Sequence, residues 1–442
     1  MMTCLFTWRT SGIEFSFLAI FFIQSLWLTG CSTKMEMVIT SREEPKAKTV
    51  AAERAEKGIT EESLYCISCH KECGVTYGGI TDWDGSIHAR KGVGCEACHV
   101  NSAPEPERRD ADELAYLSAQ RGNCEDEKVY RRVSAGTCGK CHSKEYNEFL
   151  KSRHSTAWRK IQEYEQFAAL PGDVRASKCG QCHNIQFTCN SCHTRHTFTP
   201  AGARSPEACR TCHTGPDQPY YDIYISSKHG AVHTAGQTAL PKESQSIYDL
   251  RSPVCVTCHM PQGTHNVSFG ITHGPEEGNV SYTRENNIAA GRAETADRRD
   301  MVSICARCHT SSFAQEVLAD ADLLHKDVTD SIRKAKDIIL GLEEDGILYL
   351  SSKELSDTPS LYHAIILGNL QTYHGRSDIV HFYNKLLCSA TVASKGAYHM
   401  NFPYTYFYGL AELQKDMNMI RNEARRLQEE AEIKRKREMR LR

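Results

Sequence analysis

The sequence predicts a mainly α-helical protein of short helices and loops, followed by a C-terminal helical bundle. One five-residue pattern, C-x-x-C-H, recurs eight times between Cys66 and His309, and successive first cysteines are 10 to 50 residues apart. These gaps leave room for short helices and almost no strand. After His309, residues 320–342 and 409–442 carry apolar side chains three and four positions apart, the spacing of amphipathic helices.

The repeated pattern is that of covalent haem attachment, in which two cysteines form thioethers with the porphyrin and the histidine ligates iron. A shuffled chain of this composition would contain roughly 0.05 such motifs. Zinc sites and disulfide frameworks are disfavoured, because zinc sites do not place a histidine directly after each cysteine pair. The chain is therefore predicted to carry eight packed c-type haems, on Cys66, Cys69 and His70; Cys95, Cys98 and His99; Cys138, Cys141 and His142; Cys179, Cys182 and His183; Cys189, Cys192 and His193; Cys209, Cys212 and His213; Cys255, Cys258 and His259; and Cys305, Cys308 and His309.

Composition agrees with a cofactor-rich interior. The apolar content of 40% is low for a chain of 442 residues, as expected where porphyrins supply much of the core. The formal net charge of −2 says little about partners, and no nucleic acid is expected among them.

The N-terminus predicts export. Arg9 precedes an apolar run over residues 13–28 that ends in Leu28-Thr29-Gly30-Cys31, which looks like a bacterial lipobox. We expect a signal peptide over 1–30, with Cys31 lipidated, and a flexible tether over 31–63. The alternative is an uncleaved signal anchor. Covalent haem attachment takes place outside the cytoplasm, so the expected location is the periplasm, with the protein anchored to a bacterial membrane as a lipoprotein. The haem domain is expected over 64–320 and the C-terminal helical region over 321–442.

Twelve histidines remain outside the motifs. Electron-carrying haems commonly have a second axial side chain, whereas a catalytic haem needs an open position. The count therefore allows seven bis-histidine haems and one open haem. Short spacing to a motif favours His196 and His265 as second ligands.

Longer stretches resemble the octahaem hydroxylamine oxidoreductase family, over roughly residues 64–425. The resemblance lies in WDGSIHARKGVGCEACH, in CNSCHTRHTFTPAGARSPEACRTCHTGPDQPYYDIYISSKHG, in CVTCHMPQGTHNVSFGITHG and in KGAYHMNFPYTYFYG. It implies a mainly α-helical multihaem cytochrome c fold and a homotrimer. It also implies that the fourth haem, on Cys179, Cys182 and His183, is catalytic and lacks a distal side-chain ligand.

The resemblance also implies the groups beside that haem. Gly215-Pro216-Asp217-Gln218 matches a family motif in which an Asp and a His move protons. Asp217 is the candidate acid/base, while Gln218 replaces the His and cannot titrate. In oxidative members a tyrosine of a neighbouring subunit is bonded to the catalytic porphyrin. Here Tyr404 and Tyr408 are both candidates, and the alternative is that they only pack in the bundle; reductive relatives lack the bond.

By the same resemblance, further histidines are expected as distal ligands. They are His88, His154, His196, His229 and His265, and more weakly His363, His374 and His399. Cys73 and Cys124 are candidates for a disulfide.

The expected function is oxidation of hydroxylamine or hydrazine, with electrons passed through the other haems to a cytochrome or quinol-linked partner. The alternatives are a nitrite or hydroxylamine reductase on the same scaffold, and a membrane-tethered electron-transfer cytochrome that is not an enzyme.

Overall fold

The computed structural model describes residues 9–10, 13–14, 59–72, 77–100, 129–163, 167, 170–175, 179–215, 218–239, 252–268, 296–349 and 377–441. The chain forms two compact units, Met1–Ala55 and Glu56–Arg442. In the described part of the first unit, β1 (Arg9–Thr10) pairs antiparallel with β2 (Ile13–Glu14). The rest of the predicted signal peptide, Cys31, the predicted Cys73–Cys124 disulfide, His363 and His374 lie outside the described residues.

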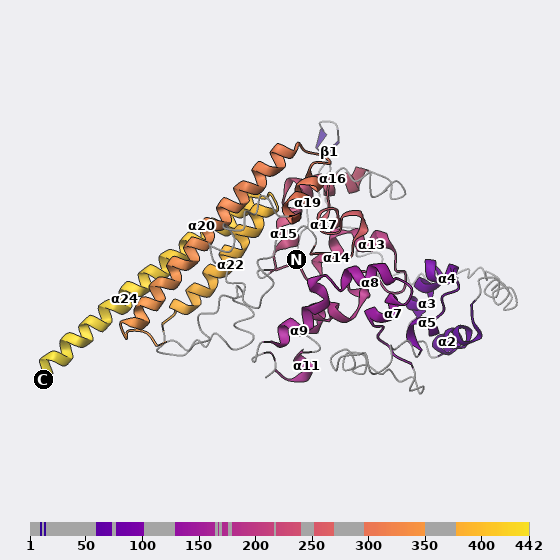
Figure 1. Ribbon diagram of the computed structural model, residues 1–442, viewed down its shortest axis with the longest axis horizontal. Helices are drawn as coiled ribbons and strands as arrows, with labels where there is room; N and C mark the ends of the chain where they lie inside the picture. The colour runs from indigo at the N-terminus through magenta and orange to yellow at the C-terminus, as the bar shows by residue number, and fades with distance from the viewer. Residues whose placement is uncertain are drawn as a thin grey trace. The chain divides into compact units, whose positions relative to one another are not determined.

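The first half of the second unit consists of short helices, as expected from the close spacing of the motifs. None that begins between residues 59 and 310 has more than 12 residues among those described. These helices (Figure 1) are α2 (Glu61–Glu72), α3 (Tyr77–Asp84), α4 (Ile87–Arg90), α5 (Glu96–His99), α7 (Ala135–Gly139), α8 (Ser143–Phe149), η2 (Arg153–Thr156), α9 (Ala157–Gln162), α11 (Gly172–Val174), α12 (Gly180–His183), η4 (Asn184–Phe187), η5 (Cys189–Ser191), α13 (Pro200–Arg204), α14 (Pro206–Arg210), α15 (Tyr220–Ile225), α16 (Lys228–Ala239), α17 (Cys255–His259), η7 (Pro261–Gly263) and α19 (Ala296–Cys305).

Three long helices follow and pack along one another: α20 (Ser311–Glu344), α22 (Ile379–Tyr398) and α24 (Ala411–Leu441) (Figure 1). The Thr310 hydroxyl begins α20 by accepting a hydrogen bond from the Phe313 N–H. The helix crosses the boundary predicted after residue 320. Helix α24 continues to Leu441, as the amphipathic spacing over residues 409–442 predicted.

The bundle has a conventional apolar core. Ile339 of α20, Leu386 of α22 and Ile420 of α24 belong to one buried cluster and have no exposed surface. Buried residues recur every three or four positions along α22, so this helix presents a continuous face to both neighbours. Among the residues that the structure describes, no helix is long and apolar enough to cross a membrane.

A short helix and one π-helical turn connect α22 to α24. They are α23 (Phe402–Tyr404) and η9 (Thr405–Leu410), and η9 packs against α22. Gly409 permits that contact, since a Cβ there would lie 2.5 Å from the Cα of Ala393. This connection carries both candidate tyrosines.

Candidate functional site

Five of the described C-x-x-C-H motifs close a helical turn with the same backbone bond. The N–H of each motif histidine donates to the carbonyl of the first cysteine, at 2.9–3.1 Å. Positions i, i+3 and i+4 of a helix share one face. Both thiols and the imidazole of a motif therefore project to the same side, as one haem requires. The five motifs are those ending in His99, His142, His193, His213 and His309.

Six motif histidines each face a second histidine from elsewhere in the chain. The separations of the ring centroids fall in a narrow range, 6.0 to 6.3 Å. The pairs, motif histidine first, are His99–His196, His142–His88, His193–His265, His213–His154, His259–His399 and His309–His229.

That separation is the one expected across an iron atom. A metal–imidazole nitrogen bond is about 2.0–2.1 Å. Adding the roughly 1 Å from each coordinating nitrogen to its ring centre gives a centroid distance of about 6 Å for two axial imidazoles. Two rings packed directly on each other could come closer, so the six pairs fit the space that an intervening metal would take.

Backbone carbonyls hold several of these rings in one tautomer. Nδ1 lies 2.7 Å from the Tyr130 carbonyl oxygen in His99 and 2.7 Å from the Lys395 carbonyl oxygen in His399. A carbonyl can only accept, so Nδ1 carries the proton and Nε2 keeps its lone pair for a metal. Burial also lowers the pKa of His154, to about 4, so this ring is neutral at pH 7.

All five histidines most strongly predicted as distal ligands, His88, His154, His196, His229 and His265, are members of these pairs. His399 supplies the sixth pair from the C-terminal end of α22, although it had been among the weaker candidates. Its ligation, like that of the other five, stays a prediction that the geometry favours.

The cysteines of different motifs lie against one another. Hydrogen bonding to Cys212 lowers the pKa of the Cys182 thiol to about 7, and similar contacts join Cys138 to Cys189 and Cys209 to Cys255. Thioether sulphurs do not titrate, so the informative result is the proximity. Burial is the main cause that raises the pKa of three further cysteines, and the charge of a nearby thiol from another motif is the second. These neighbouring pairs are Cys98 with Cys138, Cys192 with Cys209, and Cys258 with Cys305.

Taken together, these contacts order the motifs in space. The second, third, fifth, sixth, seventh and eighth motifs follow one another, and the fourth joins this series beside the sixth. The fourth and sixth motifs lie side by side. The gaps of 10 and 20 residues between the first cysteines of the fourth, fifth and sixth motifs agree with this proximity.

The fourth motif has aromatic surroundings. His183 ends α12, and its Nδ1 lies 3.0 Å from the Ala157 carbonyl oxygen of α9. The adjacent Trp158 ring contacts Phe167 and Phe187, both of which are buried. This apolar wall would exclude water from one side of a haem bound at His183.

Arg175 could bind an anionic group near the fourth motif. Its Nε is buried and has no hydrogen-bond partner among the residues that the structure describes. It stands four residues before Cys179, and a guanidinium prefers a carboxylate as its acceptor. A haem propionate would satisfy it. The residues present therefore fit covalently bound haem.

The family comparison agrees with this geometry. Residues 62–354 match the family described as "Seven times multi-haem cytochrome CxxCH", and this stretch includes all eight motifs. The chain is a multihaem cytochrome. It carries covalently bound c-type haem and belongs to the group that resembles hydroxylamine oxidoreductase (HAO).

One curated relative is a "probable nitrite reductase-hydroxylamine oxidoreductase fusion protein" of Kuenenia stuttgartiensis, 28% identical over 293 residues. The aligned region is 56% of this chain and 34% of the relative, so the cytochrome spans about a third of that protein.

Two solved structures share the fold. A reducing HAO-like protein complex of Kuenenia stuttgartiensis matches with a TM-score of 0.64 and 25% identity, covering 85% of this chain and 87% of the other. A "hypothetical multiheme protein" matches with a TM-score of 0.60 and 17% identity, covering 87% and 99%. The mainly helical multihaem fold predicted from the sequence is confirmed.

Within this cytochrome, the candidate proton-transfer residues are only partly described. Asp217 lies outside the described residues. Gln218 lies beside the ring of His213, where its amide opposes the lowering of the His213 pKa by burial. Its predicted role at the fourth haem stays a prediction, and the structure adds a contact with the sixth.

The candidate tyrosines lie on the connection between α22 and α24. Hydrogen bonds hold the start of this connection, and the residues after it are exposed. Buried Asn401 donates to the Ile223 carbonyl at 2.7 Å and to the Ser226 hydroxyl at 2.8 Å. The Tyr404 and Tyr408 rings lie 4.8 Å apart, and Tyr408 is 63% exposed. Tyr406 and Phe407 are exposed as well, so the segment offers an aromatic surface to solvent or to a second subunit.

Sequence reasoning missed Tyr220 and Lys395. The Tyr220 ring contacts both His213 and His399, and the Lys395 ammonium lies 5.7 Å from the centre of that ring. Both residues lie in stretches that carry the family resemblance, but their proximity depends on α15 meeting the end of α22.

Proposed function

We propose that this cytochrome reduces small oxidised nitrogen compounds, nitrite or hydroxylamine, toward ammonium, using eight haems of which the fourth is catalytic. The observation that carries the proposal is the placement of the fourth motif beside the sixth, where it joins the series of the other motifs. A site of multi-electron chemistry needs this connection to a chain of carriers. The likeness to a reducing HAO-like complex supports the direction.

When bound at the fourth motif, haem would supply an iron with an open position for a nitrogen ligand and a store for single electrons. His183 would hold that iron from the proximal side, with its ring oriented by the Ala157 carbonyl. The six pairs of facing histidines would keep six of the other seven haems six-coordinate, which protects them from reaction with small molecules.

Protons must arrive with the electrons. Hydroxylamine takes up two electrons and three protons on its way to ammonium and water. Asp217 is the residue proposed to deliver protons, as a general acid near the fourth haem. Gln218 can donate and accept hydrogen bonds but cannot titrate, so the site has one proton carrier fewer than the oxidative family motif.

The second candidate is the oxidation of hydroxylamine or hydrazine on the same scaffold. The exposed aromatic segment around Tyr404 and Tyr408 favours it, since a tyrosine donated to a neighbouring subunit needs to lie at the surface. This candidate requires a homotrimer and a bond from Tyr404 or Tyr408 to the porphyrin. A third possibility, an electron conduit without catalysis, requires every haem to be six-coordinate.

Turnover in both directions distinguishes the first two candidates. With a reduced dye as electron donor, we expect the protein to form ammonium from nitrite or hydroxylamine. The rate of this reduction should exceed the rate at which hydroxylamine is oxidised with an oxidised dye as electron acceptor. Asp217→Asn should slow ammonium formation roughly 10²–10⁴-fold, whereas Glu429→Gln, on the exposed face of α24, should not. The second candidate would be favoured by two results. The reduced protein would show an absorption band that is missing in Tyr404→Phe or Tyr408→Phe, and hydroxylamine oxidation would be faster than the reduction. If the ferric protein shows no high-spin signal, every haem is six-coordinate, and only the electron conduit without catalysis remains.

We also propose that the protein is a periplasmic lipoprotein whose redox partner is a cytochrome or quinol-linked protein. The lipobox ending in Cys31 supports this location. Cys31→Ser should move the protein from the membrane fraction to the soluble fraction without loss of haem. Retention of the variant in the membrane would point to an uncleaved signal anchor.

A further inference from the structure

Tyr220 lies between ligands of two different haems. Its ring centroid is 5.3 Å from that of His213 and 5.9 Å from that of His399, with both rings edge-on to it. His213 belongs to the sixth motif and faces His154, while His399 faces His259 of the seventh motif. One side chain therefore contacts one histidine of each of two facing pairs, which belong to the sixth and seventh motifs.

Independent contacts hold Tyr220 in this place. The N–H of the next residue, Tyr221, donates to the His213 carbonyl at 2.9 Å, which ties the start of α15 to the sixth motif. Asn401 ties the same helix to the chain just beyond His399 through its bonds to Ile223 and Ser226.

Lys395 completes the arrangement from the other side. Its carbonyl accepts a hydrogen bond from the His399 Nδ1, and its ammonium lies 5.7 Å from the centre of the Tyr220 ring. The same residue therefore orients the distal imidazole of the seventh haem and contacts the tyrosine that touches the sixth.

The cysteines show that these two haems are neighbours. The thiols of Cys209 and Cys255 are within hydrogen-bonding distance of each other. Electrons that pass along the predicted series must cross between these two motifs.

We propose that Tyr220 is a positioning residue shared by the sixth and seventh haems, holding His213 and His399 in fixed orientations, with Lys395 as its partner. The inference rests on the proposed function, because it needs both histidines to be iron ligands. The residues around a metal-bound imidazole set its orientation and basicity. Removal of the Tyr220 ring frees two imidazoles at once, and so changes two haems together.

Lys395 also has an electrostatic effect on the seventh haem alone. A positive charge near an iron favours the reduced state, which carries one positive charge less. Lys395 therefore raises the reduction potential of the seventh haem, whose distal ligand it holds.

Electron paramagnetic resonance of the ferric holoprotein tests the proposal, because low-spin signals depend on the orientation of the axial imidazole planes. Variants His154→Ala and His399→Ala first assign the signals of the sixth and seventh haems, each of which should become high-spin. Tyr220→Leu should then shift both assigned signals and no others. Tyr220→Phe, which keeps the ring, should shift neither, and Tyr221→Leu is the matched control, because Tyr221 points instead toward Glu207 and Arg210.

Several outcomes would overturn the inference. A Tyr220→Leu protein in which only one of the assigned signals, or neither, shifts shows that the ring is not shared. If the Tyr220→Leu protein does not fold with its haems attached, the reduction potential of the seventh haem is measured in Lys395→Met instead. This potential should be lower than in the wild type. An unchanged potential would overturn the proposal. A His399→Ala protein with every low-spin signal intact overturns the ligand assignment itself, a failure of the proposed function that is distinct from a failure at Tyr220.

Discussion

Asp416 of α24 has no exposed surface, so its carboxylate depends on the groups around it. The Ser389 hydroxyl donates to Oδ2 at 2.7 Å, and the Lys385 ammonium lies 3.3 Å from Oδ1. Both partners come from α22. A buried charge that keeps its partner costs little, but one that loses its partner is strongly destabilising.

Lys385→Met should therefore destabilise the bundle. We expect a loss of about 2–3 kcal/mol, below the full cost of a buried unpaired charge because Lys385 is 35% exposed. The lower melting temperature is measured by circular dichroism. Lys415→Met is the control: its pair with Glu412 is exposed and screened by solvent, so the melting temperature should hardly change. Equal effects of the two variants would contradict the role given to Asp416.

At the scale of elements, the contact of η9 with α22 depends on Gly409. A Cβ there would lie 2.5 Å from the Ala393 Cα and 2.7 Å from its Cβ, so backbone must move to admit it. This contact fixes where the chain leaves α22 and where the aromatic segment begins.

Gly409→Ala should cost about 1–3 kcal/mol through overpacking. The matched control is Gly341→Ala in α20, where a Cβ meets nothing within 4 Å and where alanine should stabilise the helix by about 0.4–1 kcal/mol. The melting temperature should therefore fall in Gly409→Ala and rise in Gly341→Ala. A neutral Gly409→Ala would mean that η9 is not held against α22.

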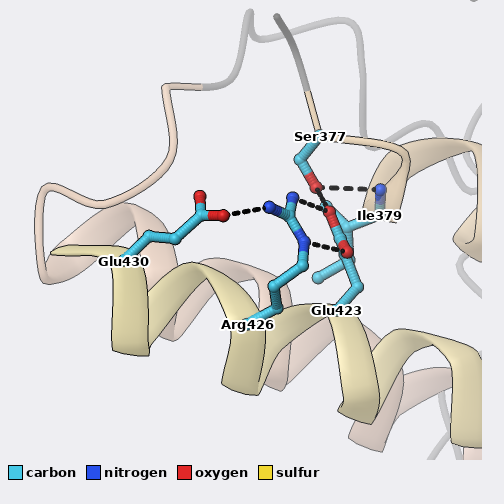
Figure 2. Close-up of polar contacts among 5 residues, drawn as sticks. All are labelled: Ser377, Ile379, Glu423, Arg426 and Glu430. Atoms are coloured by element: carbon cyan, nitrogen blue, oxygen red, sulfur yellow. Dashed lines mark hydrogen bonds and ion pairs between the residues drawn. The ribbon is translucent and has the colours of Figure 1, made fainter.

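A hydrogen bond from Ser377 to Glu423 joins α24 to the chain that precedes α22, and ion pairs within α24 hold Glu423 in place (Figure 2). Arg426 binds Glu423 through Nε and Nη2 and binds Glu430 through Nη1, while the Ser377 hydroxyl donates to Glu423 and accepts from the Ile379 N–H. Hydrogen bonds from Arg426 hold the pKa of Glu423 below its ordinary value.

A lowered carboxyl pKa stabilises the folded state above the unfolded pKa, near 4.3, and this contribution is lost as the pH falls through the folded value. The difference in stability between the wild type and Glu423→Gln should therefore be largest at pH 7 and should shrink below about pH 4.3. Thermal melts at several pH values measure it. Glu438→Gln, on the exposed end of α24, should show no such trend. A difference that stays constant with pH would indicate a packing effect.

On the scale of the whole molecule, the number of haems is the decisive quantity. Each of the eight motifs carries two thiols and a histidine, and in five of them the histidine N–H donates to the carbonyl of the first cysteine. The intact mass of protein matured in a competent host should exceed that of the processed polypeptide by eight haem masses. Seven or fewer would remove the octahaem assignment. Replacing Cys305 and Cys308 with serine should remove one haem mass and calibrates the measurement.

The haems also explain why the two halves of the second unit differ. The long helices bury Ile339, Leu386 and Ile420 against each other, as an ordinary bundle does. In the half with the motifs, the described helices are mostly too short to be stable through their own hydrogen bonds, because short helices are marginal in water. Thioether bonds and axial ligands would hold these segments instead.

The sequence by itself determined the chemistry of the motifs, because that chemistry is local. Cysteine, cysteine and histidine at i, i+3 and i+4 share one face of any helical turn, whatever the rest of the fold. The same reasoning found the amphipathic stretches within α20 and α24. It did not find α22, in which buried serine, glycine and alanine weaken the apolar periodicity.

Only the tertiary structure decided which histidine faces which. His196 and His265 follow a motif within a few residues, yet they face His99 and His193, and His399 faces a motif about a third of the chain away. The neighbourhood of Cys182 and Cys212 and the position of Tyr220 between two ligands are of the same kind. Such contacts join segments that are distant in sequence, and their free energy comes from the packing of the whole unit, which no spacing along the chain encodes.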